Sequence, residues 1–281
     1  MYLAACVPQV RARLGSAFGP LPLAAGLIVS GLAPYLLFAL LTGAHRQAAL
    51  LWLLGLCSIQ VFWFLRLPRT WWADIGFIVL FAGIVFSKVF SSIYFFPLNP
   101  SKVPASILGD LMWTRLAILA VAWFRGDPGV NLSLWPTARE WRIGLREFLY
   151  FMPLGIALGY GLQFFKLRPA PEHLGRFAIT ALAQLAGFYL FVALREEFLF
   201  RGLLLKWFTT WWRDERRALL AVSLLFGLVH LPFRQFPNWK FAILASIAGW
   251  FYGRAYQQGG GIRAAMVTHA LVVFVWRVFL V

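Results

Sequence analysis

Most of this sequence consists of apolar stretches close to the length of a membrane span, separated by short breaks that contain proline, glycine or charged residues. A helix needs about 20 apolar residues to cross the hydrocarbon core of a bilayer. In lipid the backbone must satisfy its own hydrogen bonds, and an α-helix does so within one segment. The pattern therefore predicts an all-α fold, a polytopic bundle of about eight or nine transmembrane helices.

The apolar stretches give nine candidate spans when they are read against the breaks between them. They lie near Phe18–Leu41, Ala48–Leu65, Ile75–Phe95, Ala105–Phe124, Leu145–Phe164, Phe177–Phe200, Ala218–Phe233, Phe241–Tyr256 and Ile262–Val281. The segment Asp127–Glu147 is amphipathic and mixed in charge, which predicts an interfacial link. We expect two regions: residues 1–143 without a chemical motif, and a core of residues 144–281.

Composition excludes the class of soluble globular domains. The 281 residues are 61% hydrophobic and 13% charged, whereas soluble domains are roughly 45–50% apolar and about 25% charged. The formal net charge is +16, but the basic residues are scattered singly between apolar stretches. This pattern predicts contact with anionic lipid headgroups and no nucleic-acid partner.

The basic residues also predict an orientation. Lys and Arg are more numerous in the breaks on the N-terminal side of the predicted bundle than in those on the opposite side. Cytoplasmic loops carry the excess of positive charge in membrane proteins. We therefore expect a multi-pass integral membrane protein with a cytoplasmic N-terminus.

Ionisable side chains inside apolar helices carry the most information about function, because each costs about 2.5–3.5 kcal/mol at mid-span on insertion scales. In the first half these are Lys88, Asp110 and Arg115, which are isolated from one another in the sequence. We expect these three residues to have structural roles.

The second half contains an adjacent pair of carboxylates, Glu196 and Glu197, followed by Arg201. On a helix Glu197 and Arg201 are four residues apart, so they share a face and can neutralise each other. Glu196 lies about 100° around the helix axis and can face something else. A carboxylate kept without a partner in an apolar place is suited to proton chemistry.

Two histidines occupy later spans, His230 at the end of a Phe226-x-x-x-His230 pattern and His269 in the last span. A lone histidine in a membrane helix is usually a packing hydrogen-bond partner. Two histidines together with the Glu-Glu-x-x-x-Arg pattern, on three separate helices of one half, favour a catalytic site.

These three motifs, in this order and in a hydrophobic chain, resemble the CPBP family of intramembrane proteases, which includes the CAAX prenyl endopeptidases. The resemblance covers roughly Leu145–Val281. It implies that Glu196 is the general base that activates water and that His230 helps to orient it. It implies further that Glu197 and Arg201 shape and neutralise the site, and that His269 stabilises the oxyanion.

One position departs from the family pattern. The family commonly has an asparagine four residues after the last histidine, and Val273 stands there in this chain. An absent amide donor would lower the rate about 10²–10³-fold if nothing replaced it. The neighbouring hydroxyl of Thr268 or a backbone amide are the candidate replacements.

Several alternatives remain open at this stage. The resemblance implies a glutamate-type mechanism without a cofactor, but Glu196, His230 and His269 could also form a two-His, one-carboxylate zinc site. The chain has no zincin, rhomboid or paired-aspartate motif. Val273 favours a second reading as a non-catalytic scaffold, and a proton-coupled transporter is a third. For a protease, we expect a membrane-associated protein or peptide substrate: a prenylated CAAX tail, a leader or a C-terminal sorting tail.

Overall fold

The computed structural model of the protein describes residues 8–96, 104–125, 135–168 and 174–280. Within these ranges every regular element is helical, apart from one isolated antiparallel β-bridge between Leu167 and Leu280. The all-α prediction is therefore confirmed. The chain forms two compact units, residues 1–128 and 129–281.

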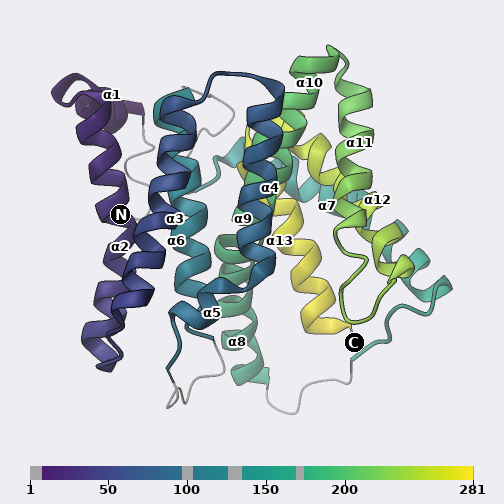
Figure 1. Cartoon of the computed structure of the whole chain (residues 1–281). Helices are drawn as coiled ribbons and strands as arrows, with labels where there is room; N and C mark the ends of the chain where they lie inside the picture. Colours follow the sequence, from purple (N-terminus) through teal and green to yellow (C-terminus); the bar gives the residue numbers. More distant parts are fainter. Residues whose placement is uncertain (1–7, 97–103, 126–134, 169–173, 281) are drawn as a thin grey trace. The chain divides into compact units, whose positions relative to one another are not determined.

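The first unit contains six α-helices and a short π-helix in its described part. They are α1 (Pro8–Ala17), α2 (Pro20–Thr42), α3 (Gln47–Arg66), α4 (Trp71–Ser87), α5 (Val89–Ile93), α6 (Ile107–Ala120) and η2 (Val121–Arg125). Helices α2, α3 and α6 pack against one another (Figure 1). Trp113 of α6 is fully buried, and its ring stacks on Phe81 of α4 with 6.2 Å between ring centroids.

Two of the isolated charges of the first half have different surroundings in this unit. Arg115 donates a hydrogen bond to the hydroxyl of Ser30 on α2 at 3.0 Å. The predicted single helix Ile75–Phe95 is wrong. Lys88 takes a left-handed conformation with φ of 55° and divides that stretch into α4 and α5. At this break the ammonium group is exposed, so it avoids the cost of burying a charge inside a span.

The second unit contains the helices that carry the motifs. They are α7 (Ala138–Gly161), α8 (Leu174–Gly187), η3 (Phe188–Ala193), α9 (Leu194–Glu197), η4 (Phe198–Leu205), α10 (Lys206–Trp212), α11 (Glu215–Leu228), α12 (Trp239–Gly259) and α13 (Ile262–Phe279). Helix α12 packs against α7, α11 and α13, and α13 also packs against α7 and η3. The predicted link Asp127–Glu147 lies outside the described residues as far as residue 134, and its end forms the first turns of α7.

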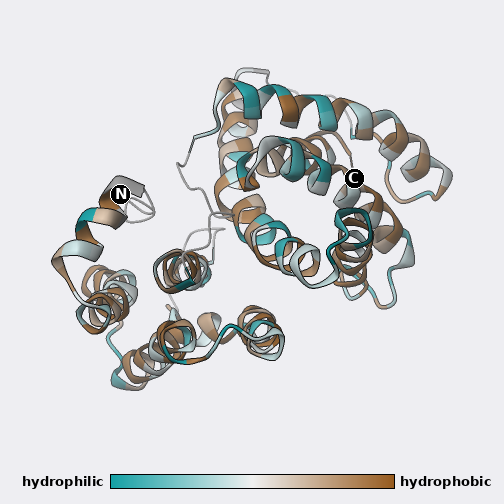
Figure 2. Cartoon of the chain, turned by 90° about the horizontal axis from the view of Figure 1, so that it is seen from above, coloured by the Kyte–Doolittle hydropathy of each residue, from teal (hydrophilic) through white to brown (hydrophobic). Residues whose placement is uncertain are grey.

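Five helical stretches of the described chain are long and apolar enough to cross a membrane. They are Pro20–Thr42, Gln47–Arg66, Ile107–Arg125, Phe177–Trp212 and Ile262–Phe279. Outward-facing residues of these helices are apolar as well as the buried ones, for example Leu40 at 80% exposure and Ile179 at 72%. Figure 2 colours long parts of the helical ribbon as hydrophobic. These features are those of a multi-pass membrane protein. The count of eight or nine spans and the orientation of the chain remain predictions.

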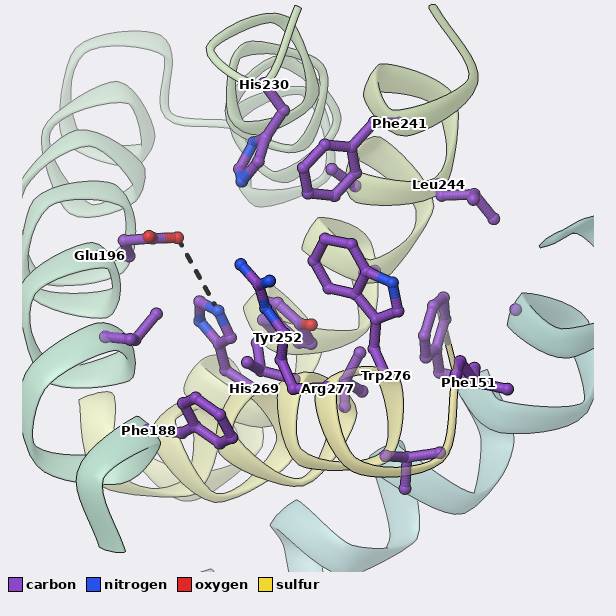
Figure 3. A pocket seen from close by; sticks show the side chains of 18 of the residues that line it. Phe151, Phe188, Glu196, His230, Phe241, Leu244, Tyr252, His269, Trp276 and Arg277 are labelled. Atoms are coloured by element: carbon purple, nitrogen blue, oxygen red, sulfur yellow. Dashed lines mark ion pairs between the residues drawn. The ribbon is translucent and has the colours of Figure 1, made fainter. Parts of the chain in front are cut away.

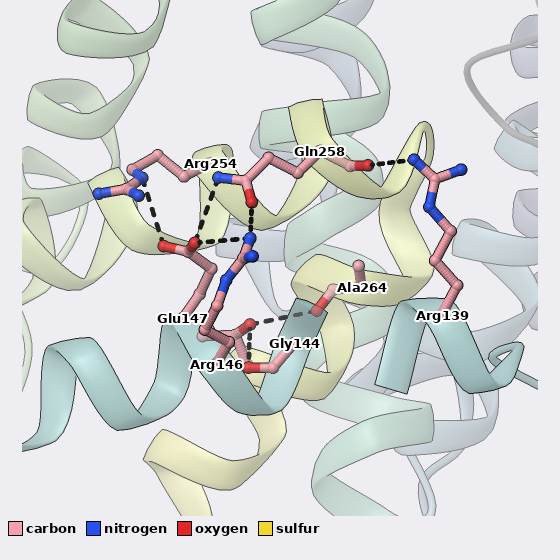
Figure 4. Close-up of polar contacts among 8 residues, drawn as sticks. Arg139, Gly144, Arg146, Glu147, Arg254, Gln258 and Ala264 are labelled. Atoms are coloured by element: carbon pink, nitrogen blue, oxygen red, sulfur yellow. Dashed lines mark hydrogen bonds and ion pairs between the residues drawn. The ribbon is translucent and has the colours of Figure 1, made fainter. Parts of the chain in front are cut away.

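Polar contacts join α7 to the α12–α13 pair at one end of the second unit (Figure 4). The fully buried carboxylate of Glu147 on α7 accepts a hydrogen bond from the side chain of Gln258 at 3.2 Å and pairs with Arg254 at 3.3 Å. Glu140, also on α7, caps the start of its own helix at Thr137 and pairs with Arg263 at 2.9 Å. These contacts fix the helices that carry the later motifs.

Two glycines allow close packing where the site helices cross. A Cβ atom on Gly144 of α7 would lie 2.6 Å from the Cβ of Val267 on α13. A Cβ atom on Gly227 of α11 would collide with the hydroxyl of Ser246 and the backbone oxygen of Ala242 on α12. Since backbone oxygens cannot rotate away, these positions require glycine.

We expect Gly227→Ala to destabilise the protein by about 1–3 kcal/mol, the usual cost of overpacking a close contact. The thermal unfolding midpoint of the detergent-solubilised protein measures this effect. Gly187→Ala on α8 is the matched control, because its Cβ would meet its nearest atom at an ordinary 3.8 Å. Equal midpoints for the two variants would contradict the close packing of α11 on α12.

Candidate active site

The two adjacent carboxylates lie inside a continuous helical stretch, where the sequence had suggested the end of a span. Glu196 and Glu197 belong to the short α9, which is flanked by the π-helical stretches η3 and η4. Wide π-type turns inside α-helices are often found at functional sites. The helix therefore continues through the motif to Trp212, and both carboxylates lie within it.

The ion pair expected between Glu197 and Arg201 is present and is buried completely. Arg201 donates to Oε1 of Glu197 at 3.0 Å, and the side chains of Arg201 and Glu197 are 1% and 0% exposed. The other terminal nitrogen of Arg201 donates to the backbone oxygen of Gly249 on α12 at 2.7 Å. The guanidinium also lies 4.7 Å from the ring centroid of Phe226, so α9, η4, α11 and α12 all meet at this pair.

His269 of α13 lies between the two carboxylates. Its Nδ1 is 2.6 Å from Oε1 of Glu197, and its Nε2 is 3.7 Å from Oε2 of Glu196 (Figure 3). The carboxylate at Nδ1 requires a proton on that nitrogen. Glu197 therefore holds the imidazole in one orientation, with Nε2 facing Glu196.

His230 lies just beyond the end of α11, which ends at Leu228, two residues before the histidine. Its Nδ1 is 2.6 Å from the backbone oxygen of Phe226. A carbonyl oxygen can only accept, so Nδ1 carries the proton and Nε2 of the neutral ring is an acceptor. Its ring also packs edge-on against Phe241, with 4.6 Å between centroids.

All three of the residues expected to be catalytic line one cavity of about 270 Å³. Glu196 is 22% exposed there, while Glu197 has no exposed surface. The rest of the lining is mainly aromatic and aliphatic, including Phe151, Phe188 and Trp276 (Figure 3). The cavity therefore presents a carboxylate and two imidazoles on an otherwise largely apolar wall.

Three further polar residues line this cavity that the sequence motifs did not indicate: Arg195, Tyr252 and Arg277. Tyr252 of α12 is 2% exposed, and its ring stacks on His269 with 4.6 Å between centroids and 14° between planes. A tyrosine within an aromatic-rich helix has no distinguishing local pattern. The position of Arg195 beside Glu196 was visible in the sequence, but the side it faces was not.

The structure also shows what surrounds the departure at Val273. Val273 lines the cavity with its apolar side chain. Thr268 does not face this space: its hydroxyl is fully buried and donates toward the backbone oxygens of Gly144 at 2.9 Å and Ala264 at 3.2 Å. Thr268 therefore ties α13 to α7, and its hydroxyl is not the replacement donor considered from the sequence.

A zinc site was the alternative use of Glu196, His230 and His269. Among the described residues no group of three or more His, Cys, Asp or Glu side chains is arranged to hold a metal ion. Nδ1 of each histidine contacts Glu197 or the Phe226 carbonyl, an arrangement that histidine ligands of metals also have. The choice between a glutamate mechanism and a zinc mechanism is therefore left to experiment.

Comparison with known proteins identifies a family for this part of the chain. Residues 178–275 match the family described as type II CAAX prenyl endopeptidase Rce1-like. No curated protein and no solved structure matches the chain. The resemblance inferred from the motifs is thus confirmed for a domain that contains Glu196, His230, His269 and the Glu197–Arg201 pair.

We expect Arg201→Met to destabilise the protein by about 3–5 kcal/mol, because it leaves the carboxylate of Glu197 buried without its cation. The thermal unfolding midpoint in detergent is the measurement. Adding Glu197→Gln to Arg201→Met should recover part of the loss. Arg217→Met is the control, since Arg217 is 82% exposed in its pair with Asp214 and exposed pairs contribute at most about 1 kcal/mol. Similar losses for Arg201→Met and Arg217→Met would contradict this assignment.

Proposed function

We propose that this chain, which carries a type II CAAX prenyl endopeptidase Rce1-like domain over residues 178–275, is an intramembrane endopeptidase that hydrolyses a peptide bond near a membrane face. The observation that supports this most is the meeting of Glu196, His230 and His269 on one cavity inside that domain. The core of the enzyme is residues 144–281.

Glu196 is the general base in this proposal. Glu197 is already neutralised by Arg201 and has no exposed surface. Glu196 is partly exposed in the cavity, and its nearest cation-capable partner among the described residues is His269 at 3.7 Å. It is therefore the carboxylate that can accept a proton from a water molecule in the cavity.

His230 orients that water. Its Nδ1 donates to the Phe226 carbonyl, so Nε2 of the neutral ring can accept one water hydrogen while Glu196 accepts the other. The aromatic contact with Phe241 holds the imidazole in place. This arrangement directs a lone pair of the water oxygen toward a substrate held in the cavity.

His269 is the electrophilic group. With both ring nitrogens protonated, it donates through Nδ1 to Glu197 and presents Nε2–H beside Glu196. In that state the charges of Glu196, Glu197, Arg201 and His269 sum to zero, which lowers the cost of keeping them in an apolar place. The Nε2–H group then stabilises negative charge on the substrate carbonyl oxygen.

The reaction consumes one water per peptide bond. Glu196 removes a proton as the water oxygen bonds to the carbonyl carbon, which gives a tetrahedral intermediate with a negatively charged oxygen. The carbonyl forms again as the carbon–nitrogen bond breaks, and the proton held by Glu196 passes to the departing amine. The products are a carboxylic acid and an amine, and Glu196 is ionised again.

The substrate is a membrane-associated protein or peptide. A cavity walled mainly by aromatic and aliphatic side chains suits a peptide bond that lies next to an apolar group or segment. The family description names CAAX prenyl endopeptidases, and a prenylated CAAX tail, a leader peptide and a C-terminal sorting tail are the candidate substrates. The lipid bilayer is the surrounding solvent, and the mechanism needs no metal or organic cofactor.

A non-catalytic scaffold of the same fold is the second candidate. It is favoured by Val273, which places an alkyl side chain on the cavity where the family commonly has an amide. In a scaffold, the buried charges would serve only to hold α9, α12 and α13 together.

We expect Glu196→Gln and His230→Ala each to abolish formation of a cleaved product in cells, because one removes the base and the other the water acceptor. Intact-mass comparison of membrane and surface proteins at matched expression provides the measurement and identifies the substrate. Glu215→Gln, at an exposed position on α11, is the control and should process normally. If all three variants process like the wild type, the scaffold replaces the protease.

Chelation provides a separate test of the glutamate mechanism. We expect the purified enzyme to keep its activity after treatment with EDTA or 1,10-phenanthroline, because the site residues are not grouped as a metal site. Cleavage of the identified substrate peptide is measured before and after treatment. A loss of activity that added zinc restores would show that the metal mechanism is correct.

A further inference from the structure

Hydrolysis at this site requires more hydrogen-bond donors than the sequence motifs supply. The carbonyl oxygen becomes an anion in the transition state, and peptidases stabilise it with donors placed in advance. His269 supplies one donor. Val273, which lines the cavity one helical turn after His269, supplies none, and the hydroxyl of Thr268 is bound to α7.

Tyr252 has the features of the absent donor. Tyr252 is 2% exposed and lines the cavity together with Glu196, His230 and His269. Among the described residues its hydroxyl is not one of the fully buried side-chain atoms that lack a partner, so the oxygen can be reached from the cavity. A phenol keeps its proton at neutral pH and can donate. The Tyr252 hydroxyl on the cavity is thus a donor available to a ligand.

The position of the Tyr252 ring is fixed by its neighbours. It is nearly parallel to the imidazole of His269 at 4.6 Å and edge-on to Phe226 at 5.8 Å. The guanidinium of Arg201 lies 5.3 Å from the centroid of the same ring. Figure 3 shows Tyr252 directly beside His269 in the cavity. A donor held in this way needs little reorganisation during the reaction.

We propose that Tyr252 is a catalytic residue whose hydroxyl donates a hydrogen bond to the carbonyl oxygen of the substrate as that oxygen becomes negative. Together with Nε2–H of His269, it completes the oxyanion site in place of the amide that Val273 lacks. The phenol keeps its proton throughout, so the balance of the hydrolysis is unchanged. This inference rests on the proposed peptidase function.

The two arginines on the cavity are less suited to this role. Arg277 is eight residues beyond His269 on α13, which corresponds to about 12 Å along the helix axis. Its guanidinium packs on Trp276 at 4.9 Å and is exposed. Within the described part of the chain, the ring that stacks on His269 is that of Tyr252, not the guanidinium of Arg195. Tyr252 is in direct contact with the imidazole that would share the oxyanion.

The test is Tyr252→Phe, which removes the hydroxyl and keeps the stacked ring. Full-length enzyme in detergent is assayed with the peptide that spans the cleavage site found in the cellular comparison. We expect kcat to fall about 10²–10³-fold with KM nearly unchanged, because the bond forms only in the transition state. Tyr256→Phe, one turn further along α12 and outside the cavity lining, is the control and should retain its kcat.

A second substitution separates catalysis from folding. Val273→Asn places an amide donor on the same cavity, so it should restore most of the kcat lost in Tyr252→Phe. An amide at this position cannot replace the packing of an aromatic ring on α12. Recovery of kcat in the double variant therefore supports the donor role even if Tyr252→Phe also lowers the unfolding temperature.

Glu196→Gln distinguishes the two ways in which the proposal can be wrong. If Glu196→Gln is inactive and Tyr252→Phe keeps the wild-type kcat, the peptidase function stands and the role of Tyr252 is refuted. The role is refuted as well if Tyr252→Phe loses activity and Val273→Asn restores none of it. If Glu196→Gln cleaves as the wild type does, the proposed function itself fails, and this inference fails with it.

Discussion

The buried pair of Glu197 and Arg201 is the interaction on which the rest of the second unit depends. Neither side chain has access to water, so each charge must be stabilised by protein groups alone. Arg201 reaches the Gly249 carbonyl on α12, and Glu197 reaches His269 on α13. Phe226 of α11 covers the guanidinium. The pair lies in the continuous helical stretch up to Trp212. Its hydrogen bonds and ring contact therefore determine where α11, α12 and α13 can pack.

The same pair explains how two adjacent carboxylates can differ in their environments. Glu197 is fully paired and closed off, whereas Glu196, one residue earlier and about 100° around the axis, borders the cavity. Close crossings at Gly144 and Gly227 and the polar contacts of α7 keep the surrounding helices together. The arrangement holds one carboxylate as a fixed counter-charge and leaves the other accessible to a small molecule such as water.

The largely apolar wall of the cavity makes every donor in it important. In such surroundings a single placed hydrogen bond stabilises developing charge more than it would in water. The alkyl side chain of Val273 cannot donate a hydrogen bond, so another group must stabilise the oxyanion together with His269. The stacking of Tyr252 on His269 links the candidate donor to the imidazole, and both are fixed by contacts with the Glu197–Arg201 pair.

The sequence by itself determined the features that depend on local spacing. Apolar stretches predicted a helical membrane protein, and four-residue spacing predicted the Glu197–Arg201 pair, since helix periodicity is a property of the chain alone. The three motifs identified the family domain. Tertiary structure decided the rest: the break at Lys88, the end of α11 before His230, the turn of Thr268 toward α7 and the placement of Tyr252 on His269. These depend on contacts between helices far apart in the sequence, and no local pattern specifies which face of one helix meets which face of another.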